Sequence, residues 1–100
     1  MIDIEISGKH LDDLHKDCGY SYEDRAMLLS EEMSELNKEL FKLIRDERCH
    51  LANSFEMFDE RRKAIIEEMA HVYICMESVK MILWITDKDI QKEIEKKERK

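Results

Sequence analysis

Apolar residues recur every three or four positions over most of this chain, which is the spacing of one face of an α-helix. The pattern predicts four helices, at about residues 8–17, 22–48, 54–85 and 87–100. In the second helix the predicted buried stripe consists of Leu29, Met33, Leu36, Leu40, Leu43 and Ile44. Residues 1–7 alternate apolar and acidic side chains, and we interpret them as an extended arm or a frayed helix start rather than a strand.

The third predicted helix has a broader apolar face than the second. This face consists of Ile65, Met69, Val72, Tyr73, Met76, Val79, Ile82 and Leu83. So wide a face predicts burial on two sides, either in the centre of a bundle or at a subunit interface. The fourth helix has only Ile90 and Ile94 among alternating acids and bases, so we expect it to dock weakly and to fray at its end.

Polar residues mark where these helices begin. A Ser, Thr or Asn just before a helix can accept a hydrogen bond from an N–H group of the first turn. The predicted caps are Ser7, Ser21, Asn53 and Thr86, and the last three have an acid three positions later. We expect Gly19 to end the first helix and residues 49–54 to form a loop.

The composition favours an all-α protein. Of the 100 residues, 41% are charged, none is proline and two are glycine, so few residues break helices. We expect one domain over residues 1–100, with an arm and short helix at 1–20 and a charged helix at 87–100. A domain of this size buries a small core. We therefore expect a bundle of about four helices that is completed by oligomerisation.

Charge and hydropathy limit the kinds of partner that we expect this protein to bind. The formal net charge of -7 argues against binding to a phosphate backbone, so we expect no nucleic-acid partner. We also expect no membrane partner, because no apolar run is long enough to cross a bilayer. The start of the sequence has no apolar signal segment, and Cys18, Cys49 and Cys75 are an odd number. We interpret them as reduced thiols of a cytoplasmic protein, with Cys75 in the core.

Two short stretches contain candidate metal ligands. Glu32 and Glu35 are three residues apart on the second helix, and Glu68 and His71 are three apart on the third. Residues at this spacing lie on one face of a helix. Glu32 and Glu68 each fall within an apolar stripe, where an unpaired carboxylate is costly. Two such pairs on facing helices can share a divalent cation such as Mg²⁺ or Mn²⁺.

Simpler interpretations of these residues remain open. Acids are abundant in this chain, and a glutamate on a helix is usually solvated or paired with a lysine at i+4. Glu35 has Glu39 at that position, so intrahelical pairing does not explain it well. His71 is either a metal ligand or a histidine bonded to a backbone carbonyl, Glu67 or Glu68.

Other candidate sites have weaker patterns. The Cys49-His50 and His15-x-x-Cys18 pairs lack the second half of a zinc site. We expect Trp84 to pack at a helix end, with stacking on a base as the alternative. The C-terminal basic residues are expected to form a solvated tail or to reach phosphates across a subunit interface; they are Lys96, Lys97, Arg99 and Lys100.

Residues 31–36 (Glu-Glu-Met-Ser-Glu-Leu) and 67–72 (Glu-Glu-Met-Ala-His-Val) together resemble the signature of the MazG-like nucleotide pyrophosphohydrolases. These are members of the all-α NTP pyrophosphatase superfamily. The family pattern is E-E-x-x-E-L on one helix and E-E-x-x-D-V on the next. The resemblance covers about residues 20–99, and His71 stands where the pattern has aspartate.

The resemblance implies a site and a reaction. Glu32, Glu35 and Glu68 would be metal ligands and catalytic residues, and His71 would be the fourth ligand. Family members use Mg²⁺, and the imidazole makes Mn²⁺ possible. They hydrolyse a nucleoside triphosphate to the monophosphate and pyrophosphate, as homodimers or homotetramers. Lys92, Lys96 and Arg99 are candidates for substrate contacts.

Two functions therefore stay open. The first is an active nucleoside triphosphate pyrophosphohydrolase. The second is a catalytically degenerate helical oligomer that acts as a binding or regulatory module. His71 distinguishes them, because a histidine at this position loses a negative charge and changes the reach of the ligand.

Overall fold

The computed structural model describes residues 4–48 and 55–98. That part of the chain contains four α-helices and no strand, which confirms the all-α prediction. The helices are α1 (Gly8–Cys18), α2 (Tyr22–Arg48), α3 (Phe55–Leu83) and α4 (Asp87–Glu98). The predicted loop at 49–54, with its cap at Asn53, lies outside the described residues.

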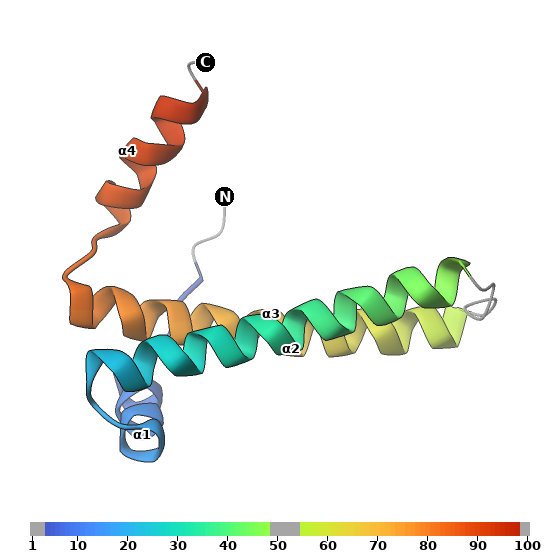
Figure 1. The fold of residues 1–100 in the computed structure, drawn as a ribbon, viewed down its shortest axis with the longest axis horizontal. Coiled ribbons are helices and arrows are strands. Elements are labelled where there is room, and N and C mark those ends of the chain that lie inside the picture. The colour runs from blue at the N-terminus through green and yellow to red at the C-terminus, as the bar shows by residue number, and fades with distance from the viewer. Residues whose placement is uncertain (1–3, 49–54, 99–100) are drawn as a thin grey trace.

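The two long helices form the body of the molecule. α2 and α3 run side by side in opposite directions, as Figure 1 shows. α1 lies across the end of this pair where α2 begins and α3 ends. α4 leaves that same end, extends away from the pair and contributes no buried side chain, which confirms the expected weak docking.

The predicted caps explain where three of the helices begin. The Ser7 side chain accepts a hydrogen bond from an N–H group in the first turn of α1. The Ser21 hydroxyl accepts one from the Asp24 N–H at 3.0 Å. At α4 the bonds are reciprocal, since Thr86 N–H donates to Asp89 at 2.9 Å and Asp89 N–H donates to Thr86 at 3.2 Å. Because these hydrogen bonds join residues three positions apart, the starts of the helices could be predicted from the sequence.

Left-handed backbone ends α1 and α3. Gly19 has φ 109°, its N–H donates to the His15 carbonyl at 2.9 Å, and a Cβ there would collide with the Asp24 carboxylate. Trp84 has φ 58°, a conformation that a bulky residue adopts under strain. Its side chain is 90% exposed, so the prediction that it packs at a helix end is wrong. After this turn α4 extends away from α2 and α3, as Figure 1 shows, and contributes no buried side chain.

Few apolar side chains are buried in the described part of the chain. Leu11 and Cys75 are the buried ones, which confirms Cys75 as a core thiol. The predicted α2 stripe is wrong in part, since Met33, Leu40 and Ile44 are exposed. On the wide face of α3, Met69, Tyr73, Met76 and Leu83 are exposed as well. Each long helix has only one long neighbour, so each covers one side of the other and leaves the remaining apolar side open.

A buried ion pair joins α2 and α3 near the ends that lie away from α1. Asp46 is 1% exposed, and its carboxylate accepts a hydrogen bond of 2.5 Å from Nε of Arg61. Arg45 lies at 3.8 Å from the other carboxylate oxygen. A carboxylate buried this deeply depends on its charged donor, because the hydrogen bond from Arg61 replaces water that the carboxylate has lost.

We predict that Asp46→Ala lowers the free energy of unfolding by about 2 kcal/mol, because a buried, charge-assisted hydrogen bond is lost. Urea denaturation at a fixed protein concentration measures this change. The matched control is Asp59→Ala, which removes the half-exposed partner of Lys63. This substitution should lower the free energy of unfolding by less than about 0.5 kcal/mol. Equal effects of the two substitutions would contradict this account of the α2–α3 contact.

Candidate metal site

Three potential ligands meet between the two long helices. Glu32 comes from α2, whereas Glu68 and His71 lie one turn apart on α3. Nδ1 of His71 is 3.3 Å from Oε2 of Glu32 and 3.6 Å from Oε2 of Glu68. One ligand atom from each residue lies within 4.8 Å of the other two. The structure thus brings together three of the four residues that the sequence motifs single out.

The two carboxylates are crowded and largely withdrawn from water. The side chains of Glu32 and Glu68 are 24% and 20% exposed, whereas that of His71 is 49% exposed. Burial raises the pKa of Glu32 above its ordinary 4.5, the neighbouring Glu68 carboxylate raises it further, and His71 opposes both. The arrangement is therefore costly when both carboxylates are ionised and no cation is present.

One carboxylate oxygen of this cluster lacks a hydrogen-bond donor among the described residues. This atom is Oε2 of Glu68, which is buried, and Nδ1 of His71, at 3.6 Å, is too far away to form a hydrogen bond with it. A buried acceptor without a donor is destabilising, and a divalent cation between Glu68, Glu32 and His71 would satisfy it. Two carboxylate oxygens and one imidazole nitrogen form a mixed donor set that suits Mn²⁺ and also accepts Mg²⁺. The residues present therefore fit a divalent cation.

Glu35 is not part of this cluster. It lies one turn beyond Glu32 on α2, with its side chain half exposed and paired with Lys38 at 3.2 Å. The expectation that intrahelical pairing does not explain Glu35 is thus wrong, because the partner is at i+3 rather than i+4. The role of Glu35 as a metal ligand remains a prediction. To bind a metal ion, Glu35 would have to separate from Lys38.

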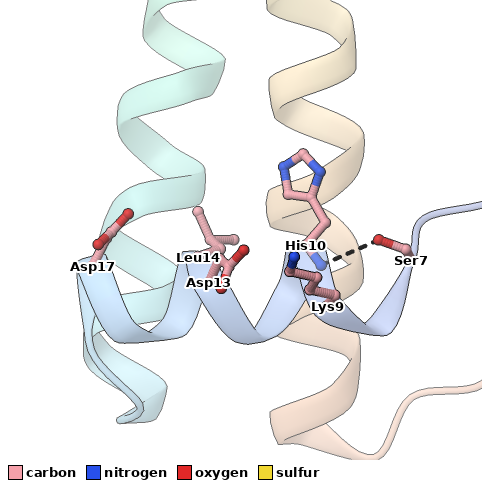
Figure 2. A pocket seen from close by; sticks show the side chains of 6 residues that line it. All are labelled: Ser7, Lys9, His10, Asp13, Leu14 and Asp17. Carbon is pink, nitrogen blue, oxygen red and sulfur yellow. Dashed lines mark hydrogen bonds between the residues drawn. The ribbon is translucent and has the colours of Figure 1, made fainter.

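An open cavity of about 270 Å³ adjoins the cluster and is lined by residues of α1, α2 and α3. Its lining consists of His10, Leu14, Leu28, Glu32, His71, Ile74 and Cys75. Figure 2 shows the His10 imidazole extending from α1 toward α3. His10 was not predicted from the sequence, because a single histidine on a short helix gives no signal until the position of the helix is known. The cavity thus has largely apolar walls and polar groups where it meets the cluster.

The predicted basic contacts are not near this site. Lys92 and Lys96 lie on α4, which extends away from α2 and α3, and Lys96 pairs with Glu93 at 2.9 Å. Arg99 lies outside the described residues. If these cations contact a ligand at the cluster, they must come from another subunit. Within residues 4–48 and 55–98, no helix is long and apolar enough to span a membrane.

No protein-family model, curated protein or solved structure matches this chain. The function therefore has to be argued from the motifs and from the geometry of the cluster.

We predict that Mn²⁺ stabilises the protein against heat and that Glu32→Gln abolishes this effect. At a free Mn²⁺ concentration about 100 times the Kd, the stabilisation is about 2.7 kcal/mol. Differential scanning calorimetry with and without the metal measures it. Glu47→Gln, which alters an exposed acid farther along α2, should keep the full shift. An equal shift in both variants would show that the metal binds elsewhere.

Proposed function

We propose that this protein is a metal-dependent nucleoside triphosphate pyrophosphohydrolase, which converts a nucleoside triphosphate to the monophosphate and pyrophosphate. The observation that carries the proposal is the Glu32–Glu68–His71 cluster, in which one buried carboxylate oxygen has no hydrogen bond among the described residues, beside a cavity with largely apolar walls. The cluster suits a cation that binds phosphates, and the cavity suits a less polar part of the same ligand. The reaction itself is inferred from the resemblance of the two motifs to those of the MazG-like nucleotide pyrophosphohydrolases.

The charge of the protein makes a cation necessary for this substrate. With a net charge of -7 and two carboxylates at the site, the chain repels a triphosphate. Glu32, Glu68 and His71 would hold Mg²⁺ or Mn²⁺, and the bound cation would neutralise phosphate charge and lower the pKa of a water molecule. Glu35 is proposed as a further ligand, because exposed pairs such as Glu35–Lys38 contribute less than about 1 kcal/mol and separate readily.

The proposed reaction is attack of water at the α-phosphorus. The bond from this phosphorus to the oxygen bridging to the β-phosphate breaks, and pyrophosphate leaves. A carboxylate must take the proton of the attacking water. Glu35 is a suitable acceptor where it is not a ligand, because it is half exposed and lies one turn from Glu32. Glu32 and Glu68 act by positioning and by their charge.

The exposed apolar faces support a homodimer or homotetramer. Met33, Phe41, Ile66 and Tyr73 are four of the large apolar side chains that α2 and α3 expose. Apolar patches of this extent usually mark protein–protein contacts. A cytoplasmic location is also part of the proposal, and it is supported by the free thiols of Cys18 and Cys75.

A binding or regulatory module without catalysis is the second candidate function. The observation that favours it is that His71 contacts both carboxylates itself. A protonated His71 would neutralise part of their charge without any metal. In this case the cluster would be a structural ion-pair network, and the bundle would bind its ligand without turnover.

We predict release of pyrophosphate from at least one member of a panel of ribo- and deoxyribonucleoside triphosphates, with Mg²⁺ and Mn²⁺ tested in parallel. Glu68→Gln should lower the rate about 100-fold or more, because a charge that positions the phosphates is lost. Glu47→Gln is again the control. A folded protein that releases no pyrophosphate with either metal would exclude hydrolysis of these substrates and favour the binding module.

His71 provides a separate prediction. His71→Ala should abolish turnover with Mn²⁺, and His71→Asp should shift the preference toward Mg²⁺, because an oxygen replaces the nitrogen ligand. Steady-state rates with each metal measure this preference. Activity that appears only in His71→Asp would identify the natural site as degenerate. Unchanged activity in His71→Ala would show that the imidazole is not a ligand.

A further inference from the structure

A second cluster of polar side chains is buried where α1, α2 and α3 meet. His15 of α1, Arg25 of α2 and Ser78 of α3 are 2%, 8% and 1% exposed. Nε2 of His15 lies 2.7 Å from the Ser78 hydroxyl. Arg25 donates from Nη1 to the Ser78 carbonyl at 3.2 Å, and its Nη2 lies 3.5 Å from Nδ1 of His15. The cluster is separate from the metal site, and the proposed hydrolysis does not use it.

These contacts require a neutral imidazole. A guanidinium can only donate, so the contact from Arg25 requires a lone pair on Nδ1 of His15. The proton of the neutral ring then lies on Nε2, which donates it to the Ser78 hydroxyl. Protonation of Nδ1 would remove this acceptor and place a second positive charge beside Arg25 in a buried setting.

The groups around His15 come from each neighbouring element. Among the described residues, Asp12 lies on the same helix, the Tyr20 ring is 5.9 Å away between α1 and α2, and Arg25 and Ser78 come from α2 and α3. Burial lowers the pKa of His15 below its ordinary 6.5, Arg25 lowers it further, and Asp12 opposes them. The surroundings therefore favour the neutral ring.

Little else holds α1 in place. Leu11 and His15 are its two buried residues, and Leu14 is partly buried. α1 also contributes Leu14 and His10 to the wall of the cavity beside Glu32. Loss of the His15 contacts therefore weakens the docking of the helix that forms one wall of this cavity.

We propose that the His15–Arg25–Ser78 cluster makes the docking of α1 a pH-sensitive switch, in which protonation of the imidazole releases α1 and opens the cavity beside Glu32 and His71. The undocked helix binds the proton more readily than the docked one. Docking is therefore strongest above about pH 6.5, weakens as the pH falls below this value, and becomes constant below the pKa of the docked state.

The test uses the metal-free full chain without nucleotide, so its result does not depend on the proposed hydrolysis. NMR gives the pKa of each histidine, and hydrogen exchange gives the protection factors of α1 amides from about pH 8 to about pH 5. We expect the pKa of His15 to lie below its ordinary value of 6.5, because burial and then Arg25 lower it. Protection of α1 should fall about tenfold for each unit that separates the docked and undocked pKa values of His15.

Two variants separate His15 from other causes. His15→Gln, which cannot be protonated, should remove the pH dependence of α1 protection, whereas His10→Gln, at the other histidine of the same helix, should keep it. If His15→Gln prevents the docking of α1 altogether, the pH titration of the wild-type protein alone tests the proposal. A His15 pKa at or above 6.5, or α1 protection that does not change with the His15 titration, would overturn the proposal.

Discussion

The packing of α2 against α3 is the interaction on which the rest of the structure depends. It brings Glu32 to Glu68 and His71, joins Asp46 to Arg61, and provides the surface on which α1 docks. A pair of helices can cover only one side of each member. The same constraint therefore explains both the enclosed polar clusters and the large apolar faces that remain open.

The charged side chains between α2 and α3 are the most informative feature of this helix pair. Apolar side chains would pack there without cost, yet two carboxylates and an imidazole share a small volume, and one carboxylate oxygen lacks a hydrogen bond. A divalent cation would balance this charge, and without one the contacts of His71 with Glu32 and Glu68 must do so. The hydrolase and binding-module interpretations therefore differ in what lies between the two carboxylates.

Local features of the fold were predictable from the sequence, whereas contacts between helices were not. Ser21 and Thr86 mark helix starts because their bonds span three residues. The pairing of Glu68 with His71 follows from helical spacing alone. The exposure of Met33 depends instead on which side of α2 meets α3. The His15–Ser78 contact joins residues 63 positions apart, and no pattern along the chain indicates it.

The central claim is that Glu32, Glu68 and His71 bind one divalent cation. The most direct measurement is an anomalous difference map from crystals of the protein grown with Mn²⁺. The account predicts a peak between α2 and α3, within about 2.2 Å of the His71 nitrogen and of an oxygen from each glutamate. A map without a peak there, at a metal concentration that supports activity or thermal stabilisation, would contradict the claim.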